Sequence, residues 1–540
     1  MMSGSAPDPS KRGRWSRRAA FFPGGLLAAI AVTACSELEP LPVPQVDAQT
    51  TSGVGGAGGA GSGGVGSTGG AGGTGTGTGG VGGSSFGSYN AEASLVAGGQ
   101  SIVPTFYRDI LPILQTRCQG CHSPGQIAPF NLITLADAQA VVTEMASATL
   151  ARIMPPWSAR STAECQPRFG WLGDQSLSAA EIELFQVWST SGARPGNPAD
   201  APPPIVPPVD ELPAVDLTLQ PKVPFVVGGD SDQFRCFVLD PQLAADRFIN
   251  GSRFLIGNPG IVHHILLVQD ELGLSDAKVD ADGGYPCFAG PEISSARYVA
   301  MWTAGSGSIQ FPPGVGMQIK AGTRLVMQVH YHLTGAPAVS DQIGLQLHFT
   351  DAAPEYRVML QGIGNFNTLD PDGDGLQPGP DDSGPPEFLI PAGVVGHTET
   401  MKFTVPTGTS ADPFPDLQIY ALMPHMHFAG SGMKIDIHRP TPPGQEPVDE
   451  CLIEAPQWRF DWTRSYRYDA ALADLPSLRS GDQLSVRCTY DNSTGNAGLM
   501  GELTQAGKPG PLDVTLGETA LDEMCLGVIT LIYKAPVAPP

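Results

Sequence analysis

Apolar positions divide the chain into a helical part and a longer β part. From Phe106 to Leu114 apolar residues recur at helical spacing, and a second helical stretch covers residues 178–189. After about Leu219, short apolar runs alternate with turns rich in Gly, Pro and Asp, a spacing typical of β-sandwiches. The clearest runs are Arg253 to Ile256, Ile261 to Val268, Thr323 to Val329, Leu417 to Met423 and Leu526 to Tyr533. We therefore predict a mainly β fold, with two jelly-roll-like β-sandwich domains after a small α-helical domain.

Changes in composition mark the boundaries of these units. Residues 53–83 are almost entirely Gly, Ala, Ser, Thr and Val, which cannot bury enough apolar surface to offset the entropy of ordering. A Pro-rich run follows the helical domain, and a segment dense in Asp, Gly and Pro at 369–386 divides the β part. The predicted units are a disordered linker at 36–100, a helical domain at 101–197, a Pro-rich linker at 198–218, and sandwiches at 219–385 and 386–540.

The N-terminus has the pattern of an export signal. Basic residues at 11–18 precede an apolar stretch at 21–34 that is too short to span a bilayer. The stretch ends in Val-Thr-Ala-Cys35, which reads as a lipobox, whose cysteine is diacylated after cleavage. The alternative is an ordinary signal peptide with an incidental cysteine. We expect residues 1–35 to be a lipoprotein signal peptide and Cys35 to anchor the exported protein to a bacterial membrane, at the periplasm or the cell surface.

Charge and cysteine content narrow the classes of partner and compartment. The chain has 53 acidic and 30 basic side chains, a formal net charge of −23. Because such a charge repels phosphate backbones, no nucleic-acid partner is expected. Nine cysteines in an exported chain permit disulfides.

The helical domain contains a c-type haem attachment motif, Cys118-Gln-Gly-Cys121-His122. In such motifs two thiols bind the haem vinyl groups covalently and the imidazole ligates the iron. A zinc site and a redox-active cysteine pair are the rival interpretations, but no second cysteine pair and no βαβ pattern accompany the motif. His122 is the only histidine of this domain. We therefore expect a cytochrome c-like domain, with Met154 on its Pro-rich loop as the sixth iron ligand.

Histidines gather in three short apolar contexts of the β part. These are Val262-His263-His264-Ile265, Gln328-Val329-His330-Tyr331-His332 and Met423-Pro424-His425-Met426-His427. Residues i and i+2 of a strand share a face, whereas two adjacent residues need a twist or a bulge before both can bind one ion. On chemistry alone, zinc sites, copper sites and hydrogen-bonded core histidines all remain open. Three imidazole clusters without a zinc-type cysteine pattern favour copper.

The order of these motifs, followed by Leu521-Asp-Glu-Met524-Cys525, resembles the ascorbate-dependent type II copper monooxygenases over roughly residues 219–535. Peptidylglycine α-hydroxylating monooxygenase and dopamine β-monooxygenase belong to this family. The resemblance implies two copper ions on two facing sandwiches, separated by a solvent-filled cleft. It implies an electron-transfer copper held by His263, His264 and His330, and a catalytic copper that activates dioxygen, held by His425, His427 and Met524. His332 has no counterpart in the family pattern.

The resemblance also implies two disulfides, one in each sandwich. These are Cys236–Cys287 in the first domain and Cys488–Cys525 in the second, where the bridge would fix the residue next to Met524. Cys165 and Cys451 remain, and the sequence leaves open whether they pair across domains or stay free.

Substrate and electron donor are the least specified features. Where the peptide-hydroxylating family members have an Arg and a Tyr that anchor a carboxylate, this chain has Met423 and Val528. We therefore expect a small, apolar organic substrate other than a peptidylglycine, hydroxylated at a C–H bond with O2. Electrons would come from an ascorbate-like reductant or from the fused haem domain. Because tethering raises effective concentration, we expect the haem to reduce the three-histidine copper.

An Asp-rich turn is a candidate calcium loop. Asp370, Asp372 and Asp374 occupy the first, third and fifth positions and Gly375 the sixth, as in calcium-binding loops, and Asp381 stands at the twelfth. Asp- and Gly-rich turns are also common without a metal.

A different class of function is a non-catalytic copper and haem electron-transfer lipoprotein. Met524 favours the enzyme, because a carrier does not need two unlike copper sites. We predict a copper-dependent monooxygenase with two copper ions and one covalent haem.

Overall fold

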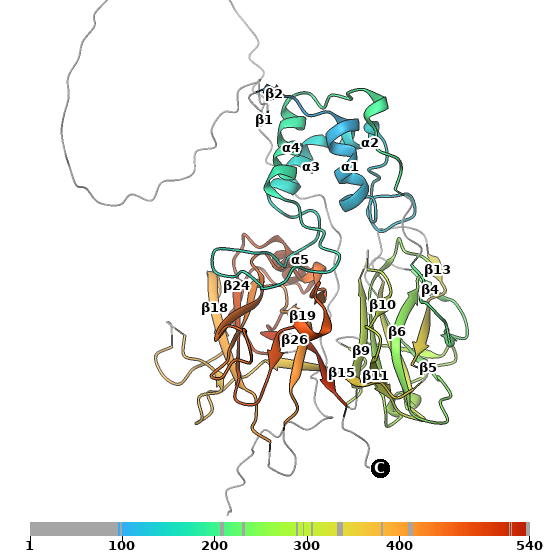
Figure 1. The fold of residues 1–540 in the computed structure, drawn as a ribbon, viewed down its shortest axis with the longest axis vertical. Helices are drawn as coiled ribbons and strands as arrows, with labels where there is room; N and C mark the ends of the chain where they lie inside the picture. The colour runs from blue at the N-terminus through green and yellow to red at the C-terminus, as the bar shows by residue number, and fades with distance from the viewer. Residues whose placement is uncertain are drawn as a thin grey trace, which may run out of the picture.

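The computed structural model describes residues 95–97, 100–205, 210–228, 233–287, 290–294, 296–303, 306–331, 338–350, 352–379, 382–408, 414–517, 519 and 521–535. The predicted signal peptide, the lipidation residue Cys35 and His332 lie outside these residues, as does most of the predicted linker. Within these ranges, no helix combines the length and the apolar character that crossing a bilayer requires. Figure 1 shows a helical unit above two β units, so the fold is mainly β.

The helical unit follows a short hairpin of β1 (Leu95–Ala97) and β2 (Gln100–Ile102), which begins inside the predicted linker. Its helices are η1 (Phe106–Ile110), α1 (Leu111–Ile113), η2 (Leu114–Cys118), α2 (Leu135–Ala140), α3 (Val142–Leu150), α4 (Ala179–Thr190) and η3 (Pro198–Asp200). Thr134 and Ser178 begin α2 and α4 with capping boxes, which satisfy the free N–H groups of the first turn. The buried core between the helices includes Phe106, Ile110, Leu114, Phe185 and Trp188.

Two sheets face each other in the first sandwich. The five-stranded sheet has the order β8-β5-β12-β7-β9, and part of a larger sheet covers its inner face. The elements are β3 (Leu217–Leu219), β4 (Phe225–Val227), β5 (Gln233–Leu239), β6 (Arg247–Leu255), β7 (Val262–Asp270), η4 (Leu274–Ala277), β8 (Gly284–Pro286), β9 (Ala296–Thr303), β10 (Ile309–Gln310), β11 (Val315–Ile319), β12 (Arg324–Tyr331), β13 (Val339–Asp341) and β14 (Gly344–Phe349).

The second sandwich also has two sheets, one of them with the order β16-β18-β24-β20-β21. Its elements are β15 (Tyr356–Gly364), β16 (Gly375–Leu376), β17 (Leu389–Ile390), β18 (Val395–Thr404), β19 (Leu417–His425), β20 (Gly430–His438), β21 (Asp449–Ala455), η5 (Phe460–Trp462), β22 (Tyr466–Arg467), η6 (Leu472–Asp474), β23 (Ser477–Leu478), β24 (Gln483–Asp491), α5 (Ala497–Gln505), β25 (Val514–Thr515) and β26 (Leu526–Lys534).

Strand β15 joins the two sandwiches. It pairs in parallel with β11 and antiparallel with β26. One sheet therefore runs through both units in the order β22-β19-β26-β15-β11-β6-β14-β3. Strand β16 precedes residue 386, yet it pairs with β18 of the second sandwich.

Three disulfides link six of the eight described cysteines. Cys236–Cys287 and Cys488–Cys525 form as the family resemblance implies. The structure also answers the question left open by the sequence, because Cys165 pairs with Cys451 across 286 residues. This third bridge fastens a loop of the helical unit to the second sandwich.

Candidate metal centres

The first candidate centre lies where β7 and β12 pair. His264 is opposite His330, and the register then shifts so that Tyr331 is opposite Val262. His263 is thus the extra residue of a bulge, which turns two adjacent imidazoles toward one point. Ring nitrogens of all three histidines lie within 4.8 Å of one another. The Nδ1 atoms of His263 and His264 are 3.1 Å apart, and those of His330 and His264 are 3.4 Å apart.

Burial favours the neutral form of His264, which is the form that can bind a metal ion. It lowers the pKa of His264 well below the usual value, and the nearby His330, His263 and His425 lower it further. A neutral imidazole is the form that ligates metal ions. The buried Nε2 of His264 has no hydrogen-bond partner. Phe234 stacks on the His330 ring, with centroids 4.2 Å apart, and so holds that ring in place.

The second candidate centre lies at the end of β19. Their i, i+2 spacing led us to expect both histidines on one face of a single strand. Instead, His425 is the last residue of β19, and His427 follows beyond the strand. Their ring centroids are 5.4 Å apart. Both ring nitrogens of His425 and the Nε2 atom of His427 are buried without a hydrogen-bond partner. Unpaired buried imidazole nitrogens are costly in a folded protein, and a bound metal ion would satisfy them.

Backbone contacts orient the second centre. The Nδ1 atom of His427 donates to the carbonyl oxygen of Asp522 at 3.0 Å, which leaves Nε2 available to a metal. Met524 immediately precedes Cys525 and β26, and it is buried. Tyr490 donates from its hydroxyl to the carbonyl oxygen of Met524 at 2.8 Å. The disulfide at Cys525 fixes the chain directly after this residue.

Glu523 links the two chain segments that carry the second centre, one with His427 and one with Met524. Our sequence analysis assigned this residue no role. Its buried carboxylate accepts backbone hydrogen bonds from His427 at 2.8 Å and from Met524 at 3.2 Å. It also accepts bonds from Ala429 and Gly430. Burial raises the pKa of Glu523 to about 8, although these bonds act against the rise. The only feature of the sequence that could have pointed to a role for Glu523 is its position directly before Met524.

The two centres lie on surfaces that face each other. Along β19, Met423 and His425 share one face, and Met423 belongs to one buried apolar cluster with Leu266 and Val326 of the first sandwich. Val528 belongs to the same apolar cluster. The resemblance led us to expect a solvent-filled cleft, whereas apolar contacts join the two sheets beside the histidines.

We expect Met423→Arg to destabilise the junction between the sandwiches. The substitution would bury a cation in an apolar cluster, which costs roughly 3 kcal/mol or more without a partner. Chemical denaturation measures the free energy of unfolding. Val395→Arg is the control, because Val395 is 71% exposed, and it should change that free energy little. Equal effects of the two variants would contradict a packed junction.

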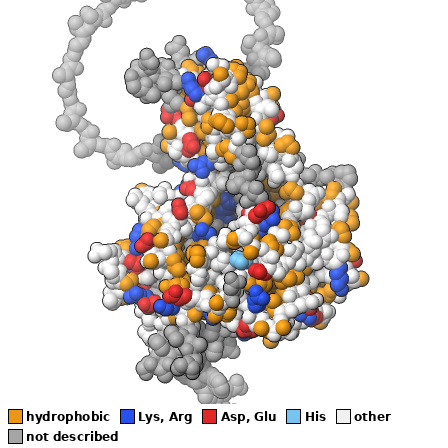
Figure 2. All heavy atoms as spheres, turned by 45° about the vertical axis from the view of Figure 1, so that its right-hand side comes forward, with side chains coloured by type: hydrophobic (Ala, Val, Ile, Leu, Met, Phe, Trp, Pro, Cys, Tyr) orange, Lys and Arg blue, Asp and Glu red, His pale blue; other side chains and the backbone are white. Residues whose placement is uncertain are grey.

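The haem attachment motif lies at the end of η2. Cys118 and Cys121 are free thiols, and burial raises the pKa of Cys118 to about 12. The Nδ1 atom of His122 donates to the carbonyl oxygen of Phe130 at 3.1 Å, which directs Nε2 away for metal binding. Phe130, Ile133 and Met154 are 42%, 40% and 37% exposed, and Figure 2 shows hydrophobic side chains gathered on the helical unit. These features fit a bound haem.

The Asp-rich turn is closed by its own hydrogen bonds. The carboxylate of Asp374 accepts from the backbone and the hydroxyl of Thr404, at 2.8 and 2.7 Å. Asp370 donates from its backbone N–H to the carbonyl oxygen of Asp374. Within the described part of the chain, the carboxylates of Asp370, Asp372 and Asp374 do not form a convergent metal-binding group. The turn lies beside β18, and Asp381, at the twelfth position of the candidate loop, lies outside the described residues.

The similarity of this chain to solved structures is remote. The major capsid protein P2 of bacteriophage PM2 has a TM-score of 0.23 at 9% identity, covering 59% of this chain and 98% of that one. The VP2 subviral particle of infectious bursal disease virus has a TM-score of 0.16 at 10% identity, covering 59% of this chain and 72% of that one. Scores this low carry no argument about fold or function.

A curated relative gives a more specific similarity, although no protein-family model matches the chain. The human putative DBH-like monooxygenase protein 2 is 25% identical over 327 residues, 57% of this chain and 54% of that protein. The chain thus spans about half the length of that relative.

Proposed function

We propose that the chain is an exported copper monooxygenase that hydroxylates a C–H bond of a small organic substrate with O2. The observation that carries this proposal is the pair of unlike ligand sets on facing surfaces of two joined sandwiches. Three imidazoles form one set. His425 and His427 begin the other, which the thioether of the buried Met524 would complete. The similarity to a DBH-like monooxygenase supports the same reaction class.

The two ligand sets suit different tasks. His263, His264 and His330 would hold a copper that passes electrons, because three imidazoles accommodate both oxidation states. His425, His427 and Met524 would hold the other copper, since a soft thioether favours Cu(I). Bound copper supplies the one-electron chemistry and the dioxygen activation that side chains lack. The protein positions the ligands, and the apolar cluster beside them excludes water.

The substrate would bind beside His425. Met423 occupies the same face of β19, and Val528 is its partner on β26. Neither side chain offers a charge or a hydrogen bond, so a substrate carboxylate would find no partner there. An apolar substrate suits this lining better than a peptidylglycine does.

The helical domain would supply the enzyme with electrons, and the N-terminal segment would attach it to a membrane. Cys118, Cys121 and His122 would hold a covalent haem, with Met154 as the second axial ligand. The orientation of His122 by the Phe130 carbonyl supports this assignment. Cys35 would carry the lipid anchor of an exported protein, and the three disulfides suit an oxidising compartment.

Labelled dioxygen tests the proposed reaction. The copper- and haem-loaded chain is incubated with ascorbate, ¹⁸O2 and a panel of apolar metabolite extracts. We expect one labelled oxygen atom in a hydroxylated product and the other in water. A matched sample carrying zinc in place of copper should give none. Oxygen uptake without labelled product from any extract would instead favour an electron-transfer lipoprotein.

A further inference from the structure

The two histidines of the second centre are held in different ways. The ring of His427 donates to the Asp522 carbonyl. The ring of His425 has no comparable support, because among the described residues neither of its nitrogens has a hydrogen-bond partner. His425 is nevertheless buried. The direction of its ring therefore depends on the backbone at the end of β19 and on the side chains packed around it.

The residue directly before His425 is held by the indole of a tryptophan. Pro424 has no backbone N–H, so its carbonyl is the only hydrogen-bonding group of that residue. Trp458 donates from its indole N–H to the Pro424 carbonyl at 3.1 Å, and the bond is buried. Because this carbonyl belongs to the peptide plane that leads into His425, the bond restrains the backbone from which the His425 side chain projects.

Trp458 also contacts the far end of the turn that carries both histidines. We call residues 424–431, from the end of β19 to the start of β20, the histidine turn. The backbone N–H of Trp458 donates to the Ser431 carbonyl at 2.9 Å. At Gly430 the indole comes so close that a Cβ atom there would lie 3.0 Å from the ring. One residue thus holds both ends of the histidine turn.

A neighbouring ring extends this contact to His427. Trp458 and Phe460 meet edge to face, with ring centroids 6.4 Å apart. Phe460 in turn stands edge-on to the His427 ring at 6.3 Å and packs against Phe428 at 4.6 Å. Two segments therefore hold the histidine turn, one with Trp458 between β21 and β22, and one with Glu523 before β26.

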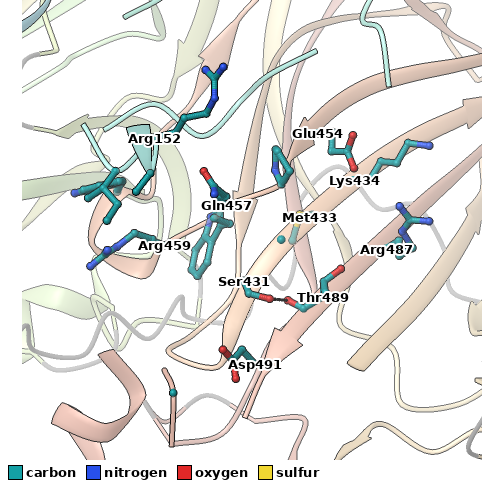
Figure 3. A pocket seen from close by; sticks show the side chains of 17 residues that line it. Arg152, Ser431, Met433, Lys434, Glu454, Gln457, Arg459, Arg487, Thr489 and Asp491 are labelled. Atoms are coloured by element: carbon teal, nitrogen blue, oxygen red, sulfur yellow. Dashed lines mark hydrogen bonds between the residues drawn. The ribbon is translucent and has the colours of Figure 1, made fainter. Parts of the chain in front are cut away.

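The indole of Trp458 also borders a cavity of about 700 Å³. Figure 3 shows charged side chains around this cavity, among them Arg152, Glu454, Arg459 and Arg487. Trp458 itself is only 3% exposed. A much smaller side chain at this position would open the histidine turn to a polar space. The hydrogen bond is therefore best tested with a replacement that keeps the shape of the ring.

We propose that Trp458 is a positioning residue of the second centre, which fixes the direction of His425 through its hydrogen bond to the Pro424 carbonyl. This inference rests on the proposed copper site at His425, His427 and Met524. Without the bond, the Pro424 carbonyl would be buried with one partner fewer, and the peptide plane would turn toward another donor. His425 would then leave the position in which it can share an ion with His427. Groups that orient metal ligands typically change metal affinity roughly tenfold to a hundredfold when they are removed.

An isosteric replacement of Trp458 tests this role. Benzothienylalanine has sulfur where the indole has N–H, so it keeps the shape of the ring and loses the donor. Trp458→Phe removes the donor together with part of the ring. Benzothienylalanine in place of Trp188 is the matched control, because the indole of this buried residue donates to the Arg194 carbonyl at 2.9 Å in the helical unit.

Copper affinity and the electron paramagnetic resonance spectrum of Cu(II) report on the second centre without turnover. Both are recorded in the His264→Ala background, so that the three-histidine centre does not contribute. We expect both replacements of Trp458 to weaken copper binding roughly tenfold or more and to change the spectrum. The replacement of Trp188 should change neither.

The isosteric variant decides the outcome. Wild-type affinity and a wild-type spectrum with benzothienylalanine in place of Trp458 would overturn the positioning role and leave the proposed function intact. If the second centre binds no copper even with Trp458 present, the proposed copper site itself is refuted, and the positioning role with it.

Discussion

Replacing Met524 with Leu is expected to reduce product formation by at least about 100-fold. Leucine keeps the volume and the apolar character, so the fold should lose less than about 1.5 kcal/mol of stability. It lacks the thioether, and the second centre then retains only His425 and His427 as ligands. Turnover with ascorbate and the copper content of the variant measure the effect. The copper at the three-histidine centre should remain.

Met433→Leu is the matched control for this variant. Met433 lies on β20 of the same sandwich and is 2% exposed, as is Met524. Because Met433 belongs to the hydrophobic core rather than to either ligand set, its substitution should leave turnover within about twofold of the wild type. Equal loss in both variants would mean that Met524 acts through packing and not as a ligand.

Glu523→Gln is expected to weaken copper binding at the second centre by roughly ten- to a hundredfold. Each carboxylate oxygen of Glu523 accepts two backbone hydrogen bonds, from residues that include His427 and Met524. The amide of Gln replaces one of these oxygens with a donor, which leaves backbone N–H groups unpaired at about 1–3 kcal/mol each. The affinity of the three-histidine centre should not change. Titration with Cu(I) under competing chelator measures both centres separately.

Glu399→Gln distinguishes this effect from the general cost of changing a buried glutamate. Glu399 is buried in the same sandwich, where its carboxylate accepts from the backbone of Leu389 and contacts His397. It makes no hydrogen bond to His427 or Met524. We expect the variant to bind copper as the wild type does. If Glu523→Gln also binds copper normally, Glu523 does not position the ligands.

The sequence indicated the β architecture because burial on the inner faces requires apolar residues at short, regular intervals. The predicted run Ile261 to Val268 corresponds to β7, and Leu417 to Met423 corresponds to β19. Periodicity says little about what joins the units, however. The register that makes β15 a partner of both β11 and β26 depends on contacts between segments far apart in the chain.

The candidate metal ligands could be recognised in the sequence, because an imidazole inside an apolar run needs a hydrogen-bond partner or a metal ion. The bulge at His263 could be anticipated because adjacent strand residues point to opposite faces. The role of Glu523 could not be anticipated, because a glutamate next to an aspartate is normally expected at the solvated surface. The attachment of residues 155–172 to the second sandwich was also hidden, since this segment resembles an ordinary loop and the disulfide partner of its Cys165 lies 286 residues away. Such features depend on tertiary contacts rather than on local pattern.

The metal content of the chain tests the central claim most directly. The protein is folded with equal amounts of copper and zinc, freed of loosely bound ions, and analysed for both metals per chain. Our account predicts two copper ions, one of which is lost in Met524→Leu and the other in His264→Ala. Two zinc ions per chain, with no copper retained under reducing conditions, would contradict it.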